Sequence, residues 1–139
     1  MLRDILEGYE IILASGSPRR QSFFKELDID FEIQLKPIEE VYPKNLKGAE
    51  ISDYLSQLKA AVFLAGLKVN QIVITSDTIV WHKSNALGKP ENKDEAIKML
   101  MTLSGESHEV ITSVCLSTKG KQIIINDTTK VTFKVLSPQ

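Results

Sequence analysis

The segment QIVITSDTIVW, residues 71–81, constrains the fold more than any other part of the chain. It begins as a continuous β-branched run, which is typical of a strand covered on both faces. We expect this strand to break at Ser76 and Asp77 before it resumes. Because predicted helices and strands alternate around it, the sequence indicates a single α/β domain over residues 1–139.

The chain before this run predicts a strand, a turn and a helix. Residues 11–14 are apolar and suit a short buried strand. Pro18 is well placed as the first residue of a helix that runs to Leu27, with Ser17 as its N-cap. We expect Phe23 and Leu27 to lie one turn apart on the buried side of that helix.

Two further helices are predicted from the three-and-four spacing of apolar residues. The first spans residues 51–67, with its apolar positions at Ile51, Tyr54, Leu55, Leu58, Val62 and Ala65. The second begins after Asn92, which forms a capping-box pattern with Glu95, and it stops at Gly105. Its apolar positions are Ala96, Met99, Leu100 and Leu103.

The remaining segments predict strands and the turns that connect them. DFEIQL, residues 30–35, suits a second strand, and residues 36–48, with two prolines and a glycine, suit a loop. Residues 82–92 are rich in turn-forming residues. The long apolar runs on either side of KGK, residues 119–121, predict a β-hairpin.

Composition narrows the class of protein. Hydrophobic residues make up 42% of the 139 residues, which is enough to build a core. The 17 basic and 18 acidic residues give a net charge of −1, so we expect no nucleic-acid or membrane partner. No apolar run approaches the roughly 20 residues of a membrane helix. The single Cys115 excludes a disulfide framework, and we expect a buried thiol in a cytoplasmic protein.

The stretch SGSPRR, residues 15–20, is a candidate anion site. A strand that leads into a helix start at Pro18 presents free backbone N–H groups near Ser15 and Ser17, and such groups attract phosphate. Arg19 and Arg20 follow at once, and a guanidinium can bind two phosphate oxygens together. The alternative interpretation is a capped helix start with solvated arginines.

Asp77 is the foremost catalytic candidate because it interrupts an otherwise apolar strand. A carboxylate in this position is either paired in the core or exposed at a strand end that faces a cleft. At a cleft it can act as a general base or as a metal ligand. The alternative is a turn-forming aspartate with Thr78 as its neighbour.

Other charged residues add to this inventory. Lys89, in the segment GKP, either points an ammonium group at a phosphate or belongs to a surface turn. Glu39 and Glu40 either supply oxygen ligands to Mg²⁺ or are solvated in their loop. Lys59 lies at the rim of an apolar helix face, where lysines more often snorkel than catalyse. Together these residues suit metal-assisted hydrolysis of a phosphoanhydride.

Four segments occur in the order and spacing of the Maf family. They are LASGSPRRQSFFKELDIDFEI, SDTIV, GKP and LSGESHEVITSV. The chain therefore resembles Maf proteins, which are nucleoside-triphosphate pyrophosphatases, from Ile11 to about Leu136. The resemblance implies an α/β fold like that of inosine triphosphatases, with a mixed twisted sheet, flanking helices, a cleft between two lobes, and a homodimer.

The resemblance also implies an activity. It implies hydrolysis between the α- and β-phosphates of dTTP, UTP or modified nucleotides with Mg²⁺ or Mn²⁺, which cleanses the nucleotide pool. By position, Asp77 matches the proton acceptor, Glu40 and Asp77 match metal ligands, and Arg19 and Thr78 match specificity residues. Phosphate binding is implied for Ser15, Ser17, Arg19, Arg20, Lys59 and Lys89.

Two departures from the family pattern bear on this expectation. The helix that matches R-L-A-x-x-K-A reads YLSQLKA, so Tyr54 and Ser56 replace an arginine and an alanine while Lys59 is kept. Family members continue past Val135 with a helix, a loop AGaYgIQG and a last strand, and we expect this chain to be truncated relative to them. The alternative hypothesis is a catalytically impaired nucleotide-binding protein with a regulatory role in cell division or septum formation.

Overall fold

The computed structural model describes residues 8–15, 17–87 and 91–135. Its strands are β1 (Glu10–Leu13), β2 (Glu32–Ile33), β3 (Gln71–His82), β4 (Asn85–Leu87), β5 (Ser107–Thr118) and β6 (Lys121–Thr132). Its helices are α2 (Pro18–Glu26), α3 (Ala49–Leu64) and α4 (Lys93–Leu103). The strands form one mixed sheet with the order β2-β1-β3-β5-β6, and β4 pairs with β3 outside that path. β1 pairs in parallel with β2 and β3, whereas the other pairs are antiparallel.

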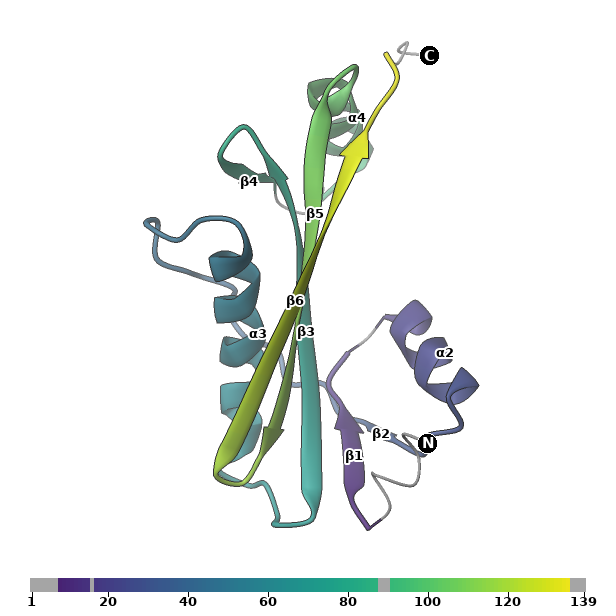
Figure 1. Ribbon diagram of the computed structural model, residues 1–139, viewed down its shortest axis with the longest axis vertical. Helices are drawn as coiled ribbons and strands as arrows, with labels where there is room; N and C mark the ends of the chain where they lie inside the picture. The colour runs from purple at the N-terminus through teal and green to yellow at the C-terminus, as the bar shows by residue number, and fades with distance from the viewer. Residues whose placement is uncertain (1–7, 16, 88–90, 136–139) are drawn as a thin grey trace.

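The central strand β3 is covered on both faces, as predicted, because its apolar side chains alternate between two helices. Ile74 packs on the face where α2 contributes Phe24, and Val73 packs on the other face against Phe63 of α3. Figure 1 shows α2 and α3 on opposite sides of β3. The cluster on the α2 side also holds Ile11, Leu13, Ile29 and Ile72. The mixed sheet with flanking helices is therefore confirmed, while the division into two lobes stays a prediction.

The predicted break in β3 at Ser76 and Asp77 is wrong. The strand continues to His82, and β5 pairs with it from Val73 to Trp81, with Asp77 opposite Ser113. The backbone ladder is therefore satisfied through the polar residues, and only their side chains need special partners. The alternation of side chains across the strand accommodates them without a turn.

Helix α2 begins at Pro18 with Ser17 as its N-cap, as predicted, but its inward side is different from the expected one. Phe23 is 57% exposed and Leu27 is also exposed, whereas Phe24 packs against the core. In this nine-residue helix, Phe24 packs against the core cluster and Arg20 bonds to Thr78 of β3. Phe23 lies on a more exposed side of the helix, so its ring stays outside the core.

Helix α3 buries a different stripe from the predicted one over its second half. Ile51 and Leu55 are buried, but Val62 and Ala65 are exposed. The other buried positions are Ser52, Ser56, Ala60 and Phe63. Small residues at four-residue spacing let α3 lie close to the sheet, and the contact line follows them to Phe63.

The end of the chain matches the prediction in outline. In α4, Asn92 caps the first turn by accepting a hydrogen bond from the Glu95 backbone N–H at 2.9 Å, but only Leu103 of its apolar stripe is fully buried. Strands β5 and β6 form the predicted hairpin, and Gly120 at its turn has φ of 98°. Cys115 is fully buried in β5, as expected.

Two strands differ from their predicted extent. β2 is only two residues long, and residues 85–87 form β4 within the segment predicted as turns. No helix among the described residues is long and apolar enough to cross a membrane.

Candidate active site

The candidate residues gather where β1 ends and β3 continues beyond it. Leu13 is the last residue of β1 and pairs with Ile74, and the Ala14 N–H donates to the Ile74 carbonyl at 3.0 Å. Beyond this point the chain turns into α2 and no longer pairs with β3. Ser76 and Thr78, which follow the paired residues of β3, line two hollows. Ligands of α/β proteins bind at such strand ends.

The turn between β1 and α2 is held by its own serines. Ser15 Oγ accepts a hydrogen bond from the Ser17 N–H at 3.2 Å, and Ser17 Oγ accepts one from the Arg20 N–H at 3.4 Å. Gln21 Nε2 donates to the Ser15 carbonyl at 2.9 Å. These contacts fix the start of α2 and therefore the place from which Arg19 and Arg20 extend.

Lys59 is the centre of a charged cluster on the α3 side of β3. Its ammonium group lies 3.0 Å from Asp77 Oδ1, 3.0 Å from Glu40 Oε1 and 3.0 Å from the Ser76 carbonyl. Three acceptors match the three protons of an ammonium group. The side chains of Asp77, Lys59 and Glu40 are 6%, 22% and 45% exposed, so the cluster runs from the core to the surface.

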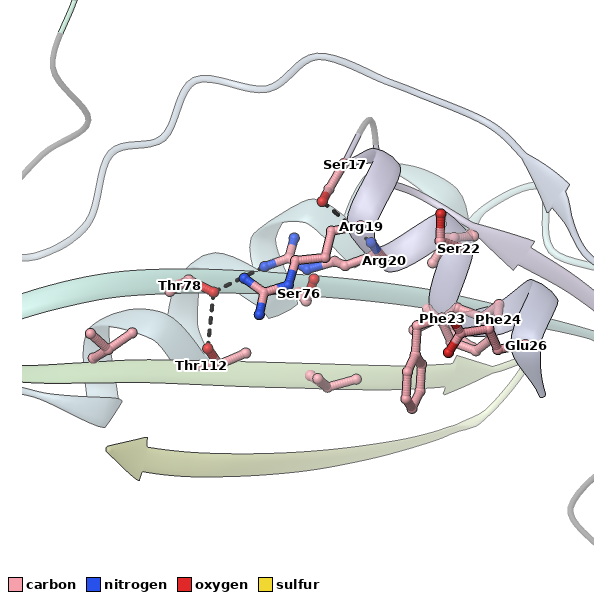
Figure 2. Close-up of a pocket in the computed structure, with 14 residues that line it drawn as sticks. Ser17, Arg19, Arg20, Ser22, Phe23, Phe24, Glu26, Ser76, Thr78 and Thr112 are labelled. Atoms are coloured by element: carbon pink, nitrogen blue, oxygen red, sulfur yellow. Dashed lines mark hydrogen bonds between the residues drawn. The ribbon is translucent and has the colours of Figure 1, made fainter. Parts of the chain in front are cut away.

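A different arrangement occupies the α2 side of β3. Arg20 Nη2 donates to Thr78 Oγ1 at 2.9 Å, and Thr78 Oγ1 lies 3.0 Å from Thr112 Oγ1 on β5. Figure 2 shows this chain of hydrogen bonds, with Arg19 and Arg20 extending from α2 over the sheet. The site thus has a guanidinium fixed by hydroxyl groups on one face and a lysine fixed by carboxylates on the other.

Two hollows adjoin these clusters and share Ser17, Arg20 and Ser76 as lining residues. The smaller, of 580 Å³, is bordered by Ser15, Glu40 and Lys59. The larger, of 1040 Å³, lies between α2 and strands β3 and β5. Its walls are formed mainly by Leu13, Phe23, Phe24, Ile74, Val110 and Val114, with Thr78 and Thr112 among them. Both hollows combine charged and apolar lining. Lys36, Glu40 and Lys59 border the smaller one beside apolar residues such as Leu35 and Phe63, and Arg19 and Glu26 border the larger one, whose walls are mainly apolar.

The carboxylates of the cluster are compatible with a divalent cation. Glu40 and Asp77 each reach the same ammonium group, so their oxygens converge on one point. Mg²⁺ is commonly bound by one or two carboxylates together with oxygens of the substrate phosphates. Among the described residues, no group of three or more His, Cys, Asp or Glu side chains is arranged to hold a metal alone. Two carboxylates and a phosphate ligand are therefore the arrangement that fits.

The structure brings most of the predicted site residues together. Around the two hollows lie Ser15, Ser17, Arg19, Arg20, Glu40, Lys59 and Thr78, with Asp77 buried behind Lys59. Of the two interpretations left open for Asp77, the paired one is the arrangement observed. Lys89 falls outside the described residues. The roles of all these residues stay predictions.

Sequence reasoning missed Thr112 and misplaced Phe23. Thr112 is a polar residue between Val110 and Val114 on the same face of β5, and that interruption of an apolar row was a usable signal. Phe23 lines the larger hollow instead of the core. Its ring lies edge-on to Phe24 at 5.9 Å, a contact that periodicity does not reveal.

Fold and site together define a mixed α/β protein with an arginine-rich turn and a lysine–carboxylate cluster at its central strand. The family model described as Maf-like protein matches residues 10–139. The chain belongs to the Maf family.

Curated relatives agree with that assignment. The chain is 56% identical over 139 residues to a dTTP/UTP pyrophosphatase of Flavobacterium johnsoniae, covering all of this chain and 72% of the relative. It is 58% identical over 139 residues to a dTTP/UTP pyrophosphatase of Flavobacterium psychrophilum, of which it covers 71%.

Solved structures share the fold at low sequence identity. A HAM1 protein from Coxiella burnetii matches with a TM-score of 0.63 and 16% identity over 88% of this chain and 71% of that chain. The Ham1 protein of Staphylococcus aureus matches with a TM-score of 0.56 and 17% identity over 87% of this chain and 70% of that chain. These likenesses show the fold alone.

Proposed function

We propose that this chain is a nucleoside-triphosphate pyrophosphatase that releases pyrophosphate and the nucleoside monophosphate. The observation that carries the proposal is the convergence of Asp77 and Glu40 on Lys59, beside the Ser15–Arg20 turn. The family assignment supports the reaction, and the names of the two Flavobacterium relatives support dTTP and UTP as substrates.

Phosphate binding is assigned to the smaller hollow. Arg20 uses one of its five N–H donors for Thr78, which leaves donors for phosphate oxygens. Lys59 adds an ammonium group to the same hollow, and Ser15 and Ser17 add the turn at the start of α2. A triphosphate carries several negative charges, so it binds best where the Arg20 and Lys59 cations converge.

The nucleoside is assigned to the larger hollow. Its walls are mainly apolar, and Thr78 and Thr112 add hydroxyl groups that can hydrogen-bond a base. Binding pockets with apolar walls and a few polar groups orient a ligand in this way. Arg20 lines both hollows, so a nucleotide that spans them passes beside its guanidinium group.

Asp77 is assigned the role of general base. In the structure Lys59 lies between the buried Asp77 carboxylate and the hollow. The anionic phosphates of a substrate compete with Asp77 for the Lys59 ammonium group, because charge-assisted bonds to phosphate are strong. Movement of Lys59 toward the phosphates would break its bond to Asp77 Oδ1, the atom assigned to accept a proton from the attacking water. Proton transfer of this kind accounts for about 10²–10⁴-fold in rate.

Divalent metal is part of the proposal, with Glu40 and Asp77 as the residues that would hold it. Bound Mg²⁺ or Mn²⁺ would neutralise charge that develops on the phosphate oxygens. Removal of the metal with EDTA should therefore abolish turnover, and restored Mg²⁺ should recover it.

The setting of the enzyme is also proposed. A cytoplasmic location agrees with nucleotide substrates and with a single cysteine that is buried and free. The homodimer implied by the resemblance is tested by the mass in solution, for which sedimentation equilibrium is the direct measurement.

The test is to identify the products that the 139-residue chain forms from UTP, dTTP and the purine triphosphates with Mg²⁺. We expect UMP and pyrophosphate from UTP, with the pyrimidine substrates preferred. Formation of UDP and phosphate would contradict the proposal. Tight binding of UTP without any turnover would instead support the alternative of a catalytically impaired nucleotide-binding protein.

A further inference from the structure

We propose that Thr112 of β5 is a positioning residue that fixes Arg20 through the hydroxyl group of Thr78. The inference rests on the proposed function, because the phosphate-binding role of Arg20 belongs to it. Thr112 would contribute to substrate affinity without contacting the phosphates. The assignment extends the site to β5, whose residues were not among the sequence candidates.

The geometry links three elements of the fold. Thr78 and Thr112 are directly paired residues on the adjacent antiparallel strands β3 and β5, and their Oγ1 atoms lie 3.0 Å apart. Arg20 of α2 reaches the same Thr78 Oγ1 at 2.9 Å. Figure 2 shows both bonds meeting at the Thr78 hydroxyl. The guanidinium is therefore tied to the middle of the sheet and not only to its own helix.

The available donors and acceptors determine the direction of the hydrogen bond from Arg20 to Thr78. A guanidinium group only donates, so Thr78 Oγ1 must accept the bond from Arg20. The second bond of this oxygen goes to Thr112, either by donating its own proton or by accepting the Thr112 proton. In both cases Thr112 sets the direction of the remaining lone pair or proton of Thr78. Without Thr112, the hydroxyl of Thr78 loses the partner that restrains it.

Packing alone does not explain a threonine at position 112. Its neighbours on the same face of β5 are Val110 and Val114, which line the larger hollow with it. Valine has nearly the shape of threonine, so a valine would serve the wall of this hollow equally well. The hydroxyl group is what distinguishes Thr112 from its neighbours, and Thr78 is the group it meets.

The consequence for binding follows from the nature of arginine. A planar guanidinium recognises phosphate through paired donors only when its plane is correctly oriented. The bond to Thr78 orients that plane at the boundary between the hollows. Loss of the Thr112 hydroxyl would leave Arg20 charged and present but less well oriented, so affinity should fall moderately rather than vanish.

The test compares Thr112→Val, Thr112→Ser and the control Thr129→Val by calorimetric binding of a Mg²⁺-UTP analogue and of inorganic tripolyphosphate. The analogue is uridine 5′-(α,β-imido)triphosphate, which resists cleavage at the bond in question. Thr129 lies on β6 opposite Val110 and is exposed. Thr129→Val is therefore the same substitution as Thr112→Val, made in another strand of the same sheet. Thermal unfolding of each variant verifies that it is folded.

The expected result is that Thr112→Val weakens both ligands by roughly three- to tenfold, the value of one net hydrogen bond. Thr112→Ser should restore affinity because it keeps the hydroxyl, and Thr129→Val should leave it unchanged. In steady-state assays, the loss should appear in KM with kcat within about twofold. Tripolyphosphate has no nucleobase. Weaker binding of this ligand therefore shows that Thr112 acts on phosphate binding, through Arg20.

Three results would overturn the inference: unchanged tripolyphosphate affinity in folded Thr112→Val, failure of Thr112→Ser to restore affinity, or an equal loss in Thr129→Val. UTP hydrolysis by the unaltered chain is measured in a separate assay, so that the two proposals can fail independently. A chain that binds both ligands but does not hydrolyse UTP contradicts the proposed function and leaves the Thr112 comparison decisive. A chain that binds neither ligand contradicts both.

Discussion

Asp77 and Thr78 are consecutive residues of β3, yet they belong to two different environments. Asp77 faces α3 and meets the ammonium group of Lys59, while Thr78 faces α2 and meets Arg20 and Thr112. The first environment is a cluster of opposite charges, and the second combines arginine side chains with hydroxyl groups and mainly apolar walls. Successive side chains of a strand point to opposite faces, so this separation follows from the pleat itself.

The difference indicates a division of labour between the two faces. Charged groups that are close together and partly buried can move protons and hold a metal, which is chemistry. Hydroxyl groups among apolar side chains orient a ligand, which is recognition. A change at Asp77 should therefore affect mainly kcat, and changes at Arg20 and Thr112 should affect mainly KM.

The largest effect is expected from Asp77→Asn. The amide keeps the size of the side chain and can still accept a bond from Lys59, but it cannot take a proton from water. We expect kcat to fall by about 10²–10⁴-fold while KM changes less than about threefold. Steady-state pyrophosphate release measures both constants. Retention of normal kcat would show that Asp77 is not the general base. It would also contradict the assignment of catalysis to the α3 face.

Arg20→Lys should have an intermediate effect, and it tests whether the α2 face determines substrate affinity. Lysine keeps the charge but loses the planar fork that meets Thr78 and phosphate together. We expect KM for UTP to rise by about tenfold, with a smaller change in kcat. The same substitution at Arg19, which lines only the larger of the two described hollows, is the matched control and should raise KM less. Equal effects at both positions would contradict the assigned role of Arg20.

The smallest effect is expected at Glu106, away from both faces of the site. Its carboxylate binds Lys83 Nζ at 2.9 Å and the His82 ring, and these bonds, with that to Lys83 the larger cause, lower the pKa of Glu106 below 4.5. A lowered pKa in the folded state stabilises the protein above the unfolded pKa, and this contribution is lost as pH falls through the folded value.

Glu106→Gln should therefore lower the Tm at pH 7 by no more than a few degrees, and the difference from the unaltered chain should close as pH falls through the lowered pKa of Glu106. Thermal unfolding from pH 3 to 7 measures it, and turnover at pH 7 should be unchanged. A gap that stays constant across this range would show that the carboxylate charge does not contribute.

Much of the site could be predicted from the sequence because its residues are local signals. Ser17 and Pro18 mark the start of α2, and Asp77 stands out as a charge in an apolar strand. The β5–β6 hairpin and the cap at Asn92 also follow from short-range patterns. In each case the determining residues lie within a few positions of one another.

The remaining features depend on contacts between distant segments. The pairing of Thr78 with Thr112 joins residues 34 positions apart, and that of Arg20 with Thr78 joins residues 58 apart. Which of Phe23 and Phe24 enters the core depends on how α2 rotates against the sheet, and both choices satisfy its periodicity. The unbroken course of β3 was missed because Lys59, which compensates Asp77, comes from another element.

The most direct test of the division between the two faces is a crystal structure with Mg²⁺ and uridine 5′-(α,β-imido)triphosphate. We predict phosphates beside Lys59 and Arg20 in the smaller hollow and the uracil ring between α2 and β5, near Thr78 and Thr112. We also predict that Lys59 moves from Asp77 toward a phosphate oxygen. A uracil ring in the smaller hollow, with phosphates among the apolar walls of the larger one, would contradict this division.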